Sequence, residues 1–305
     1  MHYPGRYTLP LNVVLLLERT KLSPHALRLF HGLFYYMDLV TAGEPTQISA
    51  TFRRAKKLRC AQLRLEVATP GTNDNDWLKK VLSELLEHKL FDVLAISANG
   101  RYLEFCPGKL VKDASARVER FAPMRTAHIK PCRSVHDILF LARAALHGGG
   151  DWPTWHLPRI AEGPLGEPWS DCRDAWLDAA AKASVLLNHA YLVAPIAGPT
   201  STCVDSVRVK AAHEATAWKP GTLYRFPVGS RPFPVVCGKR YRPLTRAEMA
   251  ARRTWCAIRA EDGPRGARTV MEHDAPAALI REAAKDGVAS AAGADLPLVE
   301  EGFPF

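Results

Sequence analysis

The chain has 305 residues, with 41 Lys and Arg against 31 Asp and Glu and a formal net charge of +10. A hydrophobic fraction of 47% and a charged fraction of 24% are ordinary globular values, which exclude a wholly disordered or collagen-like chain, and the length predicts two domains of ~100–200 residues. The longest strongly apolar run, 13–17, is far shorter than the ~20 residues that cross a bilayer, so no membrane span is expected.

The cysteines and the first residues indicate the compartment. Seven cysteines are widely spaced and no pair forms a C-x-x-C motif, so neither a disulfide framework nor a cysteine-rich zinc site is expected. Separate thiols are typical of a reducing environment. Residues 1–10 lack a basic region followed by an apolar one, so no secretory signal is predicted there. We therefore expect a cytoplasmic protein with no membrane partner.

The positive charge is concentrated in two parts of the chain. Residues 1–150 hold 22 Lys and Arg against 13 Asp and Glu, a net charge of +9, whereas 151–305 have a net charge of only +1. Within that second half, 219–259 have a net charge of +9 and 260–305 a net charge of −5. Solubility does not need such clustering, but a polyanionic partner does. The charge distribution therefore predicts that the protein binds nucleic acid.

The first forty residues predict an arm followed by a core helix. Residues 1–22 contain Pro and Gly and then a short apolar run, and we interpret them as an N-terminal arm or short strand. Ser23 and Pro24 are typical of a helix start, with Ser as the N-cap and Pro at the first helical position. Apolar residues then recur every three or four positions over 24–40, so one face of this helix should lie in the core.

A basic helix is predicted over 49–64, where Phe52, Ala55 and Leu58 form a narrow apolar stripe. The remaining faces carry six cations and no acid: Arg53, Arg54, Lys56, Lys57, Arg59 and Arg64. A helix that is only solvated normally interleaves acids, which form i, i+4 ion pairs. We therefore interpret the cluster as a phosphate-binding surface, with an ordinary solvated face as the alternative.

The next segment predicts a helix and a hairpin. Apolar positions lie on one side of 75–89, an apolar strand follows over 90–96, and a returning strand over 101–105 comes after an Asn-Gly turn. Three helices followed by a hairpin is the order of a winged helix, whose third helix enters the major groove while the hairpin touches the backbone. We therefore predict a winged-helix domain over 23–112. Its further nucleic-acid contacts would be Lys79, Lys80 and Arg101.

A second unit of the same kind is predicted after a linker. Residues 113–133 are basic and irregular, as expected of a linker. Over 134–212 the pattern again predicts an apolar helix, a later helix that ends near His189, and two strands. The end of that later helix resembles 85–91 at a distance of 101 residues. We interpret 134–212 as a second winged-helix-like domain; the alternative is that helix ends before hairpins simply look alike.

The C-terminal part is predicted to be a basic extension over 213–260 and an acidic, partly disordered tail over 261–305. The extension mixes cations with Tyr241 and Trp255, a combination that suits single-stranded nucleic acid; a basic helix that docks on a protein is the alternative. Its candidate contacts are Lys239, Arg240, Arg242, Arg246, Arg252 and Arg253.

No motif in the sequence supports an enzyme. The H-x-H pair of a nicking initiator and the H-E-x-x-H motif of a metalloprotease do not occur. Gly238-Lys239 lacks the upstream glycine of a phosphate-binding loop, and there is no G-x-S-x-G elbow. We therefore expect a non-enzymatic protein with no catalytic residue, no cofactor and no metal site.

The order of these elements resembles a known family. A helix that reads WLKKVLSELL over 77–86, then a hairpin, a linker and a second winged helix, is similar to the tandem winged-helix replication initiators of bacterial plasmids. The resemblance covers about 23–210. It implies two domains that grip repeated double-stranded DNA sites at a replication origin, without catalysis, and that recruit host proteins.

The expected fold is therefore α+β, mainly helical, with two tandem winged-helix domains and a basic C-terminal extension. The two candidate recognition helices, 74–89 and 171–189, depart from the family because each has a net charge of −1. This departure favours an alternative, a nucleic-acid-binding scaffold subunit of a ribonucleoprotein or CRISPR-like defence complex. A winged-helix transcription regulator is a further alternative. DNA is favoured over RNA as the partner, and other protein subunits are expected.

Overall fold

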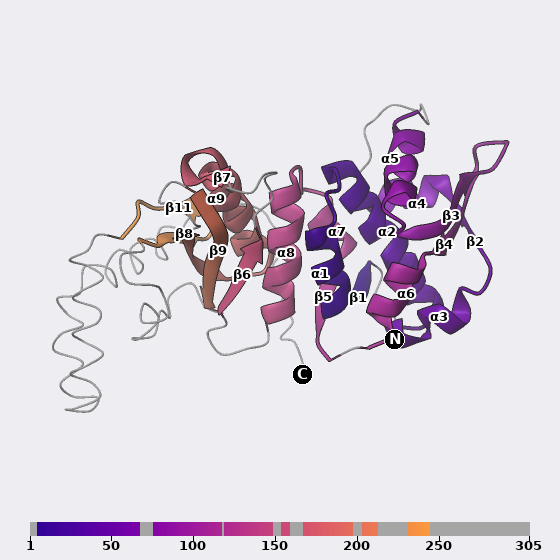
Figure 1. The fold of residues 1–305 in the computed structure, drawn as a ribbon, viewed down its shortest axis with the longest axis horizontal. Helices are drawn as coiled ribbons and strands as arrows, with labels where there is room; N and C mark the ends of the chain where they lie inside the picture. The colour runs from indigo at the N-terminus through magenta and orange to yellow at the C-terminus, as the bar shows by residue number, and fades with distance from the viewer. Residues whose placement is uncertain are drawn as a thin grey trace, which may run out of the picture.

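The computed structural model describes residues 5–67, 76–117, 119–148, 154–158, 167–197, 203–212 and 231–244 (Figure 1). Within them, helices combine with antiparallel sheets in a mixed α and β fold. The first elements along the chain are β1 (Arg6–Pro10), α1 (Leu11–Arg19), α2 (Pro24–Val40), a 3₁₀ turn (Pro45–Gln47), α3 (Ile48–Thr51), β2 (Lys56–Arg59), α4 (Cys60–Val67), α5 (Asp76–Glu87), β3 (Phe91–Ile96) and β4 (Tyr102–Pro107).

The remaining elements are α6 (Lys109–Ser115), β5 (Phe121–Arg125), α7 (Thr126–Ile129), α8 (Val135–His147), β6 (Thr154–Pro158), β7 (Glu167–Pro168), α9 (Trp169–Leu186), β8 (Ala190–Ala197), β9 (Cys203–Ala212), β10 (Phe233–Val236) and β11 (Lys239–Arg240). Among the described helices, none is both long enough and apolar enough to cross a membrane.

The N-terminal unit, residues 24–107, is built around α2. Ser23 caps this helix as predicted, because its Oγ accepts a hydrogen bond from the Ala26 N–H at 3.2 Å. Almost every side of α2 is buried, since it packs against α4, α5, α7 and α8. The predicted helix and hairpin after residue 75 are confirmed as α5, β3 and β4. The two hairpin strands and β2 form an antiparallel sheet in the order β2-β4-β3.

The predicted basic helix over 49–64 is wrong. A four-residue helix, α3, is followed by the strand β2 and then by α4. Burial alternates along β2, where Leu58 is buried and its neighbours Lys57 and Arg59 are exposed. Leu58 lies opposite Leu103 of β4. The backbone partners that make this segment a strand therefore come from a distant part of the chain, which local periodicity does not show.

The described parts of 1–22, predicted as an arm or short strand, and of the predicted linker over 113–133 both belong to the packed body, and the first contains the strand β1. β1 and β5 pair as a two-stranded sheet, in which Leu9 lies opposite Ala122 and both are buried. α1 follows directly and buries three aliphatic side chains. The two segments looked irregular because each uses the other as its partner, so neither shows a complete pattern alone.

The described part of the second unit, residues 135–240, repeats part of the order of the first, without counterparts of α3 and α4. A helix (α8), a strand (β6), a second helix (α9) and a hairpin (β8 and β9) follow one another. The strands lie in the order β6-β9-β8, which is the counterpart of β2-β4-β3. The order predicted for residues 134–212, an apolar helix, a later helix and two strands, is therefore found in the described part of that range.

The two helix ends correspond, but not in the predicted register. Lys89 after α5 and Asn188 after α9 both take the left-handed conformation, with φ of 55° and 52°. In each case the N–H of the next residue donates a hydrogen bond that closes the end of the helix. The Leu90 N–H donates to the Leu85 carbonyl and the His189 N–H to the Ser184 carbonyl, both at 3.1 Å. Lys89 and Asn188 are 99 residues apart, so the sequence match at 101 residues is shifted by two.

The described part of the predicted basic extension belongs to the second sheet. β10 pairs with β8 and with β11, so residues 231–244 extend the sheet beyond the hairpin. The turn between β10 and β11 lies against α9, where the Gly238 N–H donates to Ser184 Oγ at 2.8 Å. The remaining parts of the extension, and the whole predicted tail over 261–305, lie outside the described residues.

Helix α8 joins the two units (Figure 1). It packs against α1 and α2 on one side and against α9 and β6 on the other, and buried side chains of both units form one hydrophobic cluster. Asp137 closes a capping box with Ser134 at its start and accepts a hydrogen bond from Lys182 of α9 at 2.6 Å. Burial raises the pKa of the Asp137 carboxyl, but the bonds from Lys182 and two backbone N–H groups outweigh it and lower the pKa.

Gly108, between β4 and α6, gives a first testable prediction. A Cβ at this position would lie 2.5 Å from the Lys89 carbonyl oxygen, which belongs to the backbone and cannot rotate away. We expect Gly108→Ala to lower the free energy of unfolding by about 1–3 kcal/mol, measured by urea denaturation. The matched control is Gly148→Ala, where the nearest atom would be at 3.4 Å. Equal stability of the two variants would contradict this close packing.

Candidate nucleic-acid interface

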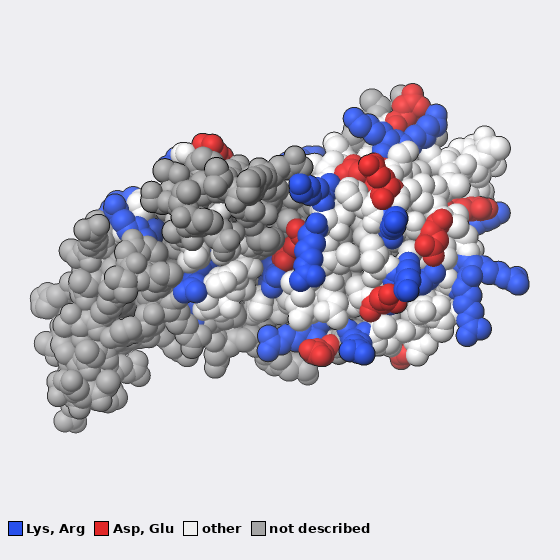
Figure 2. Space-filling view, viewed as in Figure 1, with Lys and Arg blue, Asp and Glu red and all other residues white. Residues whose placement is uncertain are grey.

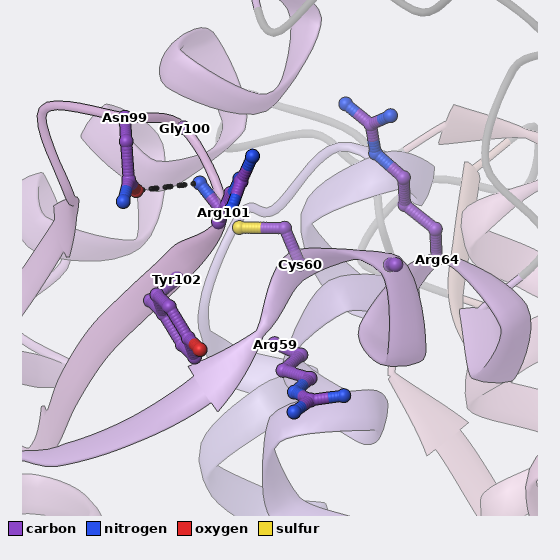
Figure 3. A pocket seen from close by; sticks show the side chains of 8 residues that line it. Arg59, Cys60, Arg64, Asn99, Gly100, Arg101 and Tyr102 are labelled. Carbon is purple, nitrogen blue, oxygen red and sulfur yellow. Dashed lines mark hydrogen bonds between the residues drawn. The ribbon is translucent and has the colours of Figure 1, made fainter.

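Three arginines line one hollow of about 580 Å³ at the edge of the three-stranded sheet (Figure 3). Arg59 ends β2, Arg64 lies on α4, and Arg101 lies in the β3–β4 turn. The other lining residues are Cys60, Ala61, Asn99, Gly100 and Tyr102. None of the lining residues in the described part of the chain is a carboxylate, so the site carries an excess of positive charge.

The turn that carries Arg101 is held by its own hydrogen bonds. Asn99 Oδ1 accepts from the Arg101 N–H at 3.1 Å and from Ser97 Oγ at 2.7 Å. Gly100 takes a positive φ of 67°, which the predicted Asn-Gly turn requires. The Cys60 N–H then donates to the Arg101 carbonyl at 2.9 Å and joins the turn to the start of α4. These bonds hold the backbone of the turn against the start of α4.

The side chains around the hollow suit anion binding better than catalysis. Arg59 and Arg101 are exposed and Arg64 is half-buried. Burial raises the pKa of the Cys60 thiol, although the nearby Arg64 cation acts in the opposite direction. A protonated, buried thiol is a poor nucleophile, so Cys60 has a packing role. A guanidinium binds phosphate oxygens through paired N–H donors, which is the chemistry that this arrangement offers.

Four further predicted cations lie on or just before β2. Arg53 and Arg54 are exposed between α3 and β2, Lys56 is exposed at the start of β2, and Figure 2 shows Lys and Arg side chains projecting at this end of the molecule. Lys57 is also exposed, but its Nζ lies 2.9 Å from Glu104 Oε1 of β4. Part of the charge of Lys57 is therefore compensated within the sheet.

Helix α5 uses most of its acids internally. Glu84 accepts hydrogen bonds from the backbone N–H of Ser23 and, at 2.6 Å, from its hydroxyl, so it caps α2. Asp76 pairs with Lys79 on the same helix at 2.8 Å. Lys80 is exposed on the surface of α5. The charge of Lys79 is therefore partly compensated within α5, as that of Lys57 is within the sheet.

The described candidate contacts of the predicted basic extension lie in another part of the molecule. Lys239 and Arg242 are exposed, but Arg240 pairs with two acids of α9, Asp178 at 3.0 Å and Asp174 at 3.6 Å. β11 and β2 lie toward opposite ends of the molecule (Figure 1). The structure thus brings Arg59, Arg64 and Arg101 together but keeps 239–242 apart from them. Three other predicted contacts lie outside the described residues: Arg246, Arg252 and Arg253.

Sequence reasoning missed Tyr102 and Asn99 as parts of this surface. The Asn-Gly turn was recognised, and the exposed ring at 102 alternates with the buried Leu103, so the signal was present in the hairpin pattern. Within the described part of the chain, no group of three His, Cys, Asp or Glu side chains is placed to hold a metal ion.

Comparison of the chain with protein-family models, with curated proteins and with solved structures finds no match.

Proposed function

We propose that the chain is a non-enzymatic protein that binds double-stranded DNA and acts as a plasmid-type replication initiator in the cytoplasm, together with other protein subunits. The observation that carries the proposal is that Arg59, Arg64 and Arg101 line one hollow, and that none of its described lining residues is a carboxylate. These residues come from a strand, a helix and a turn, so their clustering is a property of the tertiary structure. Phosphate groups along a backbone are the partners that such a surface fits.

The topology supports a winged helix in each unit. In that fold a strand lies between the first two helices, the hairpin follows the third helix, and the last strand lies in the middle of the sheet. The order α2, β2, α4, α5, β3, β4 with the sheet order β2-β4-β3 agrees with this arrangement. In the second unit the sheet order β6-β9-β8 agrees with this arrangement, but its described part has only two helices, α8 and α9, before the hairpin.

The first unit would make the main DNA contacts. Lys79 and Lys80 of α5 would reach the major groove, while Arg101 in the turn and Arg59 on the edge strand would hold the backbone beside it. Arg53, Arg54 and Lys56 would extend this contact along the duplex. The backbone contacts would supply affinity, and the helix contacts would supply sequence preference.

One observation favours the second candidate, a scaffold subunit that binds nucleic acid inside a ribonucleoprotein or defence complex. In the second unit, Arg240 of β11 pairs with the acids Asp174 and Asp178 of α9. Lys182 of the same helix points to Asp137 of α8. Because the charged side chains of α9 are already paired within the protein, this helix is better suited to contact another protein than to bind in a DNA groove. The duplex would then be replaced by RNA or an R-loop held by the first unit.

A salt titration of the purified chain tests the proposal. We expect binding of a mixed-sequence DNA duplex whose affinity falls by roughly 10³–10⁵ between ~50 and ~200 mM salt, as for ~6–10 phosphate contacts. Fluorescence anisotropy at several salt concentrations gives the slope. Absence of binding to DNA and RNA at low salt, or binding indifferent to salt, would refute the proposal. Sequencing of nucleic acid crosslinked to the chain in its host separates an initiator, which selects repeated duplex sites, from a scaffold that carries RNA.

A further inference from the structure

Tyr102 gives the arginine-lined hollow an exposed aromatic wall. It lies directly opposite Arg59 in the β2–β4 pair, and opposed residues share one face of a sheet. Their neighbours Leu58 and Leu103 are buried on the other face. Alternation therefore sends the ring and the guanidinium out on the same side of the sheet, and Figure 3 shows Tyr102 on the strand that follows the turn and Arg59 on the neighbouring strand. The Tyr102 side chain is 36% exposed, a large value for an aromatic in a central strand.

The turn adds directed hydrogen-bond donors to this wall. Asn99 Oδ1 is occupied by the Arg101 N–H and by Ser97 Oγ. Its Nδ2 therefore lies on the opposite side of the amide, where its two hydrogens can donate to a ligand. Asn99 and Tyr102 both line the hollow with Arg59 and Arg101. Cations, an aromatic ring and an amide donor thus meet in one concave place.

The size of the hollow suits a small polar ligand. At about 580 Å³ it falls within the ~300–1,000 Å³ of typical ligand sites. A phosphate group alone would bind the arginines but has no flat surface that could stack on the ring of Tyr102. A nucleotide has both a phosphate for the arginines and a base with a flat face for the ring.

We infer that this hollow holds one unpaired nucleotide of a DNA strand, with its phosphate on Arg59 and Arg101 and its base stacked on Tyr102. The inference rests on the proposed DNA binding and adds which form of DNA the site selects. A paired base within a duplex has both faces covered by its neighbours, so it cannot stack on a protein ring. A bulged or melted position leaves one face open. The site thus favours DNA that is locally unpaired over a perfect duplex.

The experiment compares three DNA molecules that share the same flanking duplex: a perfect duplex, the same duplex with one bulged nucleotide, and one with an abasic bulge. We expect the unmodified chain to bind the bulged duplex about tenfold more tightly than the perfect one, because each base stacked on an aromatic ring contributes a factor of this order. The abasic bulge should bind like the perfect duplex, because it has no base to stack.

Variants at position 102 assign the preference to the ring. Tyr102→Ala should remove the preference for the bulge, so that this variant binds the bulged and the perfect duplex with equal affinity. Tyr102→Phe, which keeps the ring, should retain the preference. Phe121→Ala is the matched control, since Phe121 is an exposed aromatic on β5, outside the hollow. Circular dichroism of each variant checks that the fold is kept.

The outcomes separate this inference from the proposed function. Equal binding of bulged and perfect duplexes overturns the inference and leaves DNA binding intact. A preference for the abasic bulge equal to that for the bulged base also overturns it, because bending rather than stacking would then be recognised. If an equimolar free mononucleotide displaces the bulged DNA, the hollow binds a free nucleotide. This result would overturn the inference that it holds a nucleotide within a DNA strand. Failure of all three DNA molecules to bind at low salt refutes the proposed function as well.

Discussion

The combined substitution Arg53→Ala, Arg54→Ala, Arg59→Ala and Arg101→Ala is expected to weaken duplex binding at least on the order of 100-fold at low salt. This factor needs only about 0.7 kcal/mol from each of the four contacts, which is less than the about 1.5–3 kcal/mol of a charged hydrogen bond. The slope of log affinity against log salt should become shallower by about 3 to 4, because each phosphate contact contributes about 0.9. All four side chains are exposed, so the fold should be kept. Anisotropy titrations at several salt concentrations measure both quantities.

A variant with the same loss of charge on another surface is the control. Four other arginines are also exposed, namely Arg19 on α1, Arg117 and Arg120 before β5, and Arg133 before α8, and Figure 1 shows α1, β5 and α8 away from β2. Their replacement by alanine should change affinity much less, because charges more than a Debye length of about 8–10 Å from the phosphates are screened. Equal losses in the two variants would mean that net charge, rather than the hollow, determines binding.

Single substitutions sharpen the same prediction. Lys57→Ala should reduce affinity less than Arg59→Ala, since Lys57 already pairs with Glu104 and Arg59 lines the hollow. Arg64 is half-buried on α4, so its replacement would mix a loss of charge with a loss of packing. A larger effect of Lys57→Ala than of Arg59→Ala would move the contact from the hollow to the sheet face.

The substitution Glu18→Leu is expected to lower the free energy of unfolding by about 3–5 kcal/mol, because it leaves the Arg143 cation half-enclosed and without its partner. Glu18 of α1 and Arg143 of α8 form a two-pronged ion pair, with Arg143 Nη2 2.7 Å from Glu18 Oε2. Their side chains are only 4% and 14% exposed. Chemical denaturation followed by circular dichroism measures the loss.

The double variant Glu18→Leu and Arg143→Met separates the ion pair from the packing. Apolar side chains of similar size in place of both partners should recover most of the stability, since a buried ion pair is often neutral relative to a well-packed apolar pair. If Glu18→Leu alone leaves the stability unchanged, α1 is not a tightly packed part of the body. Equal losses in the single and double variants would attribute the effect to packing at position 18.

Some elements could be predicted because their signals are local. Helix α2 begins at Ser23, where the hydroxyl accepts from an N–H three residues later. The hairpin turns at Asn99 and Gly100, whose conformational preferences do not depend on distant residues. In each case the interaction that decides the structure lies within a few residues of the motif.

Other elements could not be predicted because their partners are far away in the chain. β2 reads as a basic helix by spacing, but its backbone pairs with β4, where Leu58 meets Leu103. β1 reads as an arm, but it pairs with β5 and places Leu9 opposite Ala122. A strand is stabilised by hydrogen bonds to another strand, and an edge position with exposed cations does not show a strong apolar alternation of its own.

By itself, the sequence determined that the protein is basic in two blocks, that it carries no recognised catalytic motif, and that a capped helix and an Asn-Gly hairpin occur in its first third. Only the tertiary structure decided which cations lie close together in space. Arg59, Arg64 and Arg101 meet because β2 pairs with β4 and the turn closes on the start of α4, whereas Arg240 is drawn to the acids of α9. Charge can be counted along a chain, but its local density depends on which distant segments the backbone hydrogen bonds and the packed core bring side by side.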